Sequence, residues 1–136
     1  GNYRELSGQI RSLESRLTEI SELKKQILGY AKTREIYSEY RKHGYSKRFF
    51  EEHREELTIH KAAKEYFDQH GIRKLPKIKD LNQEYGELLQ QKKELYTQYR
   101  KTKEESRQLQ LARRNVDTFL GLDQNESQKK EQVKEQ

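Results

Sequence analysis

Apolar residues in the N-terminal part of the chain alternate between four- and three-residue spacings, beginning with Leu6, Ile10, Leu13, Leu17 and Ile20. This spacing is typical of a helix that packs one face against another helix. After residue 20 the stripe broadens, and its members are Leu23, Ile27, Tyr30, Ala31, Tyr37 and Tyr40. The pattern predicts a helix over about residues 3–42, which would be about 60 Å long.

Two glycines matter for this first helix. Gly29 lies inside it, where glycine costs roughly 1 kcal/mol relative to alanine. Gly44 follows a basic pair that suits a helix C-terminus, and it can adopt the left-handed conformation that ends a helix.

A second helix is predicted over about residues 47–70. Ser46 supplies a side-chain acceptor for its start, and Gly71 supplies its end. Glu51 and Glu52 lie in the early turns, where the helix dipole favours negative charge. The inward face would consist of Phe49, Phe50, His53, Leu57, His60, Ala63 and Phe67.

A third helix is predicted over about residues 77–120, with the only proline, Pro76, at its first turn. Its register runs through Leu81, Tyr85, Leu88, Lys92, Leu95, Tyr99, Thr102, Ser106, Leu109, Arg113, Val116 and Leu120. The four polar members of this series either fix the alignment of the helices or mark an exposed half, and the sequence leaves both open. Residues 122–136 are predicted to be a polar tail or linker.

These elements predict an all-α fold with one helical domain over residues 1–121. Two arrangements fit the pattern. One is a long antiparallel hairpin with the shorter middle helix at its closed end, and the other is an up-down-up three-helix bundle. We favour the hairpin, because a middle helix of about 36 Å cannot cover two partners nearly twice as long.

Composition supports a thin helical seam rather than one large core, because 30% of the 136 residues are hydrophobic and 38% are charged. No apolar run reaches membrane-spanning length, no signal peptide is evident, and cysteine is absent. We therefore expect a cytoplasmic protein without a membrane partner. The chain begins at Gly1 and contains no methionine, so we expect it to be a piece of a longer polypeptide.

Positive charge is concentrated in the two turns that flank the middle helix. The first basic turn holds Arg41, Lys42, Lys47 and Arg48, and the second basic turn holds Arg73, Lys74, Lys77 and Lys79. Their combined +8 exceeds the net charge of +6, so the rest of the chain is net negative by two. With Tyr45 between them, these cations predict a basic tip that contacts nucleic-acid phosphates, while the ring stacks on bases.

The positive charge of the two turns also fits two roles without nucleic acid. Cations at helix ends complement the helix dipoles and aid solubility, and an acidic protein partner would bind the same cations. A third basic run, over residues 100–114, is diluted by Glu104 and Glu105 and is more typical of a solvated face.

Catalytic and metal-binding patterns are not evident. His53 and His60 are seven residues apart, whereas a chelating pair on one helix prefers adjacent turns. We expect both histidines to be partly buried and hydrogen-bonded. The sequence contains no glycine-rich phosphate loop and no cysteine nucleophile, and its seam tyrosines have the spacing of packing residues. We therefore expect no catalytic residue, metal or cofactor in this chain.

Three segments carry a family resemblance: YSEYRKHGYSKRFFEEHREELTIHKAAKEYF over residues 37–67, LPKIKDLNQEY over residues 75–85, and ARRNVDTFLG over residues 112–121. They resemble the region downstream of the nuclease domain in relaxases, the mobilisation proteins of bacterial conjugative plasmids and integrative transposons. The resemblance covers roughly residues 23–121 and involves many ordinary residues rather than a catalytic motif.

The resemblance implies a parent protein that nicks DNA with a tyrosine nucleophile and a histidine-bound metal. The sequence has no His-x-His cluster, so no catalytic residue can be assigned here. The implied role is that of a noncatalytic accessory domain. Its basic tip would bind DNA, an auxiliary mobilisation protein or a secretion-coupling protein. The alternatives are a scaffold that homodimerises through the heptad seams or docks a partner, and an RNA-binding helical arm.

Overall fold

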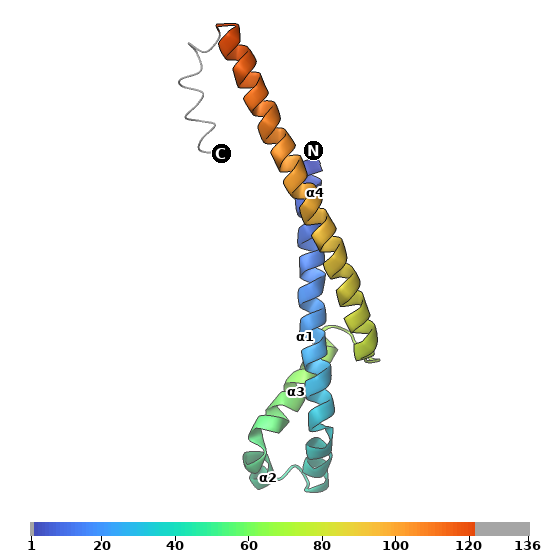
Figure 1. The fold of residues 1–136 in the computed structure, drawn as a ribbon. Helices are drawn as coiled ribbons and strands as arrows, with labels where there is room; N and C mark the ends of the chain where they lie inside the picture. The colour runs from blue at the N-terminus through green and yellow to red at the C-terminus, as the bar shows by residue number, and fades with distance from the viewer. Residues whose placement is uncertain (1, 122–136) are drawn as a thin grey trace. The chain divides into compact units, whose positions relative to one another are not determined.

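The computed structural model describes residues 2–121, and every regular element in that range is a helix (Figure 1). The predicted all-α class is therefore confirmed, while the predicted tail over residues 122–136 lies outside the described residues. The helices are α1 (Asn2–Lys42), α2 (Lys47–Glu52), α3 (Arg54–Gln69) and α4 (Ile78–Phe119).

The chain divides into two compact units. The larger unit is Arg11–Lys92, and the smaller unit contains residues 2–10 together with residues 93–121. The long helices α1 and α4 each contribute a segment to both units, and in each unit α1 packs on α4.

The turn after α1 forms where the sequence predicts it. Gly44 adopts φ +64°, and Tyr45 follows it in the same left-handed region with φ +58°. The amide of Tyr45 donates to the carbonyl of Tyr40 at 3.0 Å, which satisfies an acceptor at the helix end. Ser46 then caps α2, because its side-chain oxygen accepts a hydrogen bond from the amide of Phe49 at 3.3 Å.

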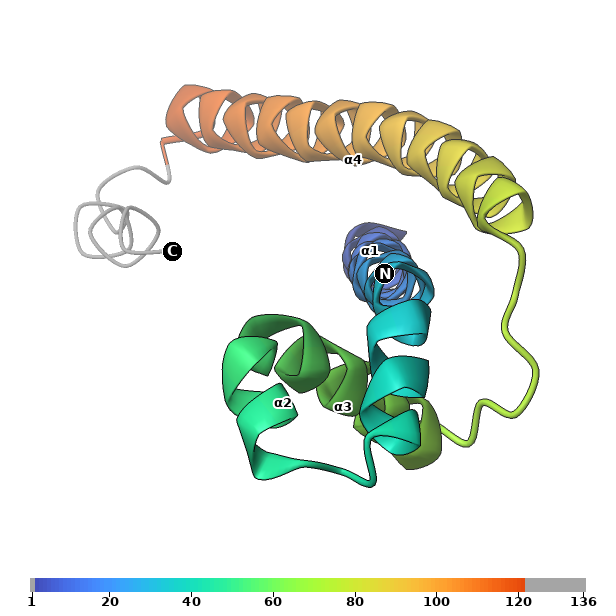
Figure 2. The ribbon, with the colours of Figure 1, turned by 90° about the horizontal axis from the view of Figure 1, so that it is seen from below.

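The prediction of one middle helix over residues 47–70 is wrong in one respect, because this segment forms two helices, α2 and α3. His53 separates them with φ −125° and ψ 32°, which lies outside the helical region. Aromatic packing explains the break. The rings of Phe49 and Phe50 lie 6.0 and 6.1 Å from that of Tyr40 at the end of α1. A change of direction at His53 lets α2 keep these contacts while α3 runs back along α1. Figure 2 shows the bend between α2 and α3.

The core of the larger unit lies where the middle of α1 meets both α3 and the start of α4. Its buried members are Ile20, Leu23, Ile27, Ala63, Phe67 and Leu81. Contacts of α3 fall on the C-terminal half of α1, where Tyr37 lies against His60 and Tyr30 lies against Phe67. The two helices are therefore antiparallel.

Ion pairs join α1 to α4 within the larger unit. The guanidinium of Arg16 donates two hydrogen bonds to the carboxylate of Glu84, at 2.7 and 3.0 Å. Nearby on the same two helices, Lys92 Nζ lies 3.6 Å from Glu14 Oε2. Lys92 is one of the polar residues of the predicted seam, and this contact supports its interpretation as an alignment residue.

In the smaller unit, the first turns of α1 pack on α4. The rings of Tyr3 and Tyr99 are 4.8 Å apart, and the Tyr99 hydroxyl donates to the Tyr3 hydroxyl at 2.9 Å. Ile10 is buried in this unit, whereas Ser106 and Arg113 on α4 are exposed. At these two positions of the predicted register, the polar residues therefore mark an exposed part of the helix.

Candidate functional site

All eight cations of the two basic turns are exposed. The first basic turn joins α1 to α2, and the second lies in the loop before α4 and in its first turn. Along the chain, α2 and α3 lie between the two turns, and the 16 residues of α3 span about 24 Å. The structure thus places the predicted site residues in two clusters instead of one tip.

Two cations of the first basic turn have acidic neighbours. Lys42 Nζ lies 3.5 Å from Glu39 Oε1, and Arg48 Nε lies 3.2 Å from Glu52 Oε1. Both cationic side chains are at least 70% exposed, and such surface pairs are worth little because water screens them. Arg41 and Lys47 have no carboxylate within 4 Å among the described residues. The turn therefore keeps most of its positive potential.

The second basic turn is held in place by its apolar residues. Ile72 and Leu75 pack against the core, and the amide of Ile72 donates to the carbonyl of Phe67 at 2.8 Å. Gly71 has φ +64° and ends α3 as predicted. Because the apolar residues alternate with the cations, Arg73, Lys74, Lys77 and Lys79 are left exposed. None of these four lies within 4 Å of a carboxylate in residues 2–121.

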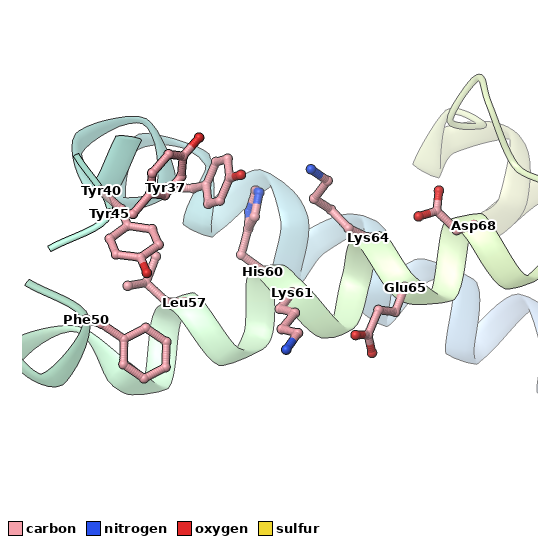
Figure 3. Close-up of a pocket in the computed structure, with 10 residues that line it drawn as sticks. All are labelled: Tyr37, Tyr40, Tyr45, Phe50, Leu57, His60, Lys61, Lys64, Glu65 and Asp68. Carbon is pink, nitrogen blue, oxygen red and sulfur yellow. The ribbon is translucent and has the colours of Figure 1, made fainter. Parts of the chain in front are cut away.

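An aromatic pocket of about 390 Å³ opens beside the first basic turn (Figure 3). It is lined by Tyr37, Tyr40, Tyr45, Phe50, Leu57, His60, Lys61, Lys64, Glu65 and Asp68. Tyr45, a predicted site residue, is 56% exposed and packs edge-on against Tyr40 at 5.3 Å between ring centroids. Its left-handed backbone holds the ring at the pocket, so planar groups and cations meet in one place.

His60 forms part of the pocket wall and is only 3% exposed. Its ring stacks on Tyr37 at 4.3 Å and on Tyr30 at 4.9 Å. The Thr33 hydroxyl donates to the carbonyl of Gly29 at 2.7 Å, so it accepts from the Nδ1–H of His60 at 2.9 Å. Burial lowers the pKa of His60, and the nearby positive charges of Lys64 and Arg34 lower it further. The neutral imidazole is therefore a packing and hydrogen-bonding group.

His53 lies apart from His60, at the junction of α2 and α3, with its Nδ1 3.3 Å from Glu56 Oε2. Within residues 2–121, no group of three or more His, Cys, Asp or Glu side chains could hold a metal ion. The expectation that no metal or cofactor binds stays a prediction. In the same part of the chain, no helix is both long and apolar enough to cross a membrane.

Sequence reasoning missed two cations of the pocket. Lys64 Nζ lies 5.2 Å from the ring centroid of Tyr37, and Lys61 is one turn earlier on α3. The sequence did contain a signal for a shared polar surface, because the spacing of residues 61, 64, 65 and 68 by three and four places them on one helix face. Nothing in the sequence, however, indicated that Tyr37 and Tyr40 would lie opposite that face.

No family model matches this chain, and neither a curated protein nor a solved structure is significantly similar to it.

Proposed function

We propose that this chain is a noncatalytic accessory domain of a conjugative relaxase, in which the helices form a hairpin-like module that contributes DNA binding. The observation that carries the proposal is the exposure of eight cations in two turns that contain no acidic residue. Such cations release counterions from a phosphate backbone, which favours association. The resemblance of residues 23–121 to the region downstream of relaxase nuclease domains supports the choice of DNA and of the parent protein.

The length of α3, which lies between the two clusters along the chain, suits a duplex. Phosphates of one strand follow each other by 3.4 Å along the axis, so the length of α3 corresponds to about seven base pairs. Beside the first cluster, the exposed ring of Tyr45 offers a stacking surface for an unpaired base. We infer that phosphate contacts supply affinity and that any base contact adds to it.

The test is fluorescence anisotropy with labelled duplex and single-stranded DNA over a series of salt concentrations. The test variant replaces Arg41, Lys42, Arg73 and Lys74 with glutamate. The matched control places the same charge change on α4, at Arg100, Lys101, Lys103 and Arg113, all of which are exposed. Binding should be lost in the test variant, and the log–log salt slope should fall by about one per lost contact.

Three outcomes would contradict the proposal. Unchanged DNA affinity in the test variant removes the basic turns from the interface. An equal loss in the α4 control shows that net charge alone is responsible. A strong preference for structured RNA over duplex DNA favours an RNA-binding arm instead.

A second candidate function is self-association through the C-terminal end of α4, where large apolar side chains are exposed. Leu109 and Val116 on α4, and Leu120 directly after it, are between 55% and 66% exposed. Sedimentation velocity over a range of concentrations would detect an oligomer. Serine at Leu109 and Val116 should dissociate it, and a concentration-independent monomer before substitution counts against this function.

A further inference from the structure

A second concave surface lies between α1 and α3, on a different face of α3 from the aromatic pocket. This surface is a groove of about 850 Å³. Its lining residues come from α1 between positions 21 and 33 and from α3 between positions 56 and 62, and they are Ser21, Lys24, Lys25, Gln26, Leu28, Gly29, Lys32, Thr33, Glu56, Thr58, Ile59 and Ala62. Leu28 on α1 is 45% exposed and Ile59 on α3 is 41% exposed, so the two helices each contribute a large apolar side chain to the groove. Neighbouring exposed apolar residues with a polar rim are typical of a protein-binding surface.

Close approach of the two helices shapes this groove. A Cβ atom on Gly29 would lie 3.1 Å from Ile59 Cγ2, so the missing side chain lets α3 pack tightly against α1 at this level. The furrow between the two antiparallel helices at this level is the groove. The α1 segment of 13 residues that borders it is about 20 Å long, which corresponds to between three and four helical turns.

The α1 rim of the groove is positive. Lys24, Lys25 and Lys32 line it, and none of the three lies within 4 Å of a carboxylate in the described part of the chain. The acidic lining residue is Glu56 on α3, whose carboxylate is 3.3 Å from His53. The groove thus combines an apolar floor with unpaired ammonium groups along one side.

We propose that this groove binds an amphipathic helix of a partner protein. Apolar residues of the partner helix would pack on Leu28 and Ile59. Its acidic residues would face Lys24, Lys25 and Lys32. Apolar residues at positions i, i+3 or i+4, and i+7 of such a helix would follow the furrow. The opposite charges would orient it and favour association. This surface is independent of the proposed DNA contacts, since it shares no residue with the basic turns.

Charge and composition disfavour other occupants. Residues 122–136 contain only Leu122 and Val133 as aliphatic residues, which is too few for three anchors. The apolar stripe of α4 in a second copy would bring six basic and three acidic residues, counted over 100–120, against a basic rim. Nucleic acid would satisfy the lysines but would gain nothing from burying Leu28 and Ile59.

The experiment uses the whole chain with labelled isoleucine and leucine methyl groups, observed by NMR. The probe is a synthetic helical peptide of about 15 residues, with leucines at the three anchor positions and glutamates beside them. Its matched control carries lysines in place of the glutamates. We expect the acidic peptide to shift the methyl signals of Leu28 and Ile59, and the basic peptide to leave them in place.

Two sets of variants locate the contact. The double substitution Leu28→Ser and Ile59→Ser should weaken peptide binding at least tenfold, whereas Leu111→Ser, at a side chain 39% exposed on α4, should not. The double substitution Lys25→Glu and Lys32→Glu should reverse the preference toward the basic peptide. Circular dichroism of each variant checks that the helices are retained.

Binding of neither peptide at millimolar concentration would overturn the proposal. Equal binding of both peptides, or shifts confined to residues of the aromatic pocket, would also overturn it. If duplex DNA shifts the Leu28 and Ile59 signals and the acidic peptide does not, the groove belongs to the nucleic-acid surface instead.

Discussion

Helices α1 and α4 are nearly equal in length, at 41 and 42 residues, yet they differ sharply in burial. Five aliphatic residues of α1 are buried, namely Ile10, Leu17, Ile20, Leu23 and Ile27, whereas Leu81 is the one buried residue among those described on α4. The difference arises because α1 packs on α4 and also on α3. Similar heptad patterns on α1 and α4 therefore contribute differently to stability, depending on which helices pack against their apolar residues.

The largest expected effect is at Ile20, which is fully buried. Replacing Ile20 with alanine should cost about 2–5 kcal/mol of unfolding free energy, because apolar contacts are lost and a cavity remains. The matched change on α4, Leu109→Ala, removes an exposed side chain and should alter stability by about 0.5 kcal/mol or less. Urea unfolding followed by circular dichroism measures both. Equal losses would show that the exposed stripe of α4 is covered in solution.

The second effect is a pH dependence of the unfolding free energy that arises from His60, which packs α3 onto α1. Its folded-state pKa lies below the unfolded value near 6.5, so the unfolded chain binds more protons between the two values. This contribution to stability is complete above pH 6.5 and is lost as the pH falls through the folded-state pKa. Urea unfolding of the native chain and of His60→Gln between pH 7.5 and 5 should show a steeper decline for the native chain. Parallel curves would mean that the imidazole is solvated.

Several local features of the fold were predictable from the sequence. The ends of α1 and α4 lie within one residue of the predicted bounds, and Ser46, Gly44 and Gly71 act as predicted. Caps and glycine stops are local, so neighbouring residues determine them. The break at His53 was not predictable in this way. No proline or glycine occurs there, and the rings that favour the break contact Tyr40 on another helix.

The candidate site was predictable in part for the same reason. Exposure of the basic turns follows from their composition, whereas their separation by α3 depends on how that helix packs. The aromatic pocket requires Tyr37 to lie opposite His60, which is a matter of helix register. Likewise, Gly29 looked like a flaw in the sequence, yet Ile59 on α3 occupies the space beside it.

Two glycines test this contrast at a smaller scale. Gly86 on α4 has open space around its missing Cβ, so Gly86→Ala should stabilise the chain by about 1 kcal/mol through helix propensity. At Gly29 the new Cβ would meet the Ile59 side chain, so Gly29→Ala alone should stabilise the chain by less than Gly86→Ala does. In an Ile59→Ala background the gain should recover to that at Gly86. Thermal unfolding of these variants gives the comparison, and identical gains at both glycines in the native background would contradict the tight approach.

The smallest effect concerns the ion pair that joins the two long helices. Arg16 holds Glu84 by two hydrogen bonds and lowers the pKa of that carboxyl group. Both side chains are more than one-third exposed, so Glu84→Gln should cost less than about 1 kcal/mol. Because the folded-state pKa is lowered, the contribution is present above the unfolded value and is lost as the pH falls through the folded one. The difference between native and Glu84→Gln chains should therefore shrink in acid and in high salt. If the difference persists in acid below the folded-state pKa of Glu84, geometry rather than charge makes this contact between α1 and α4.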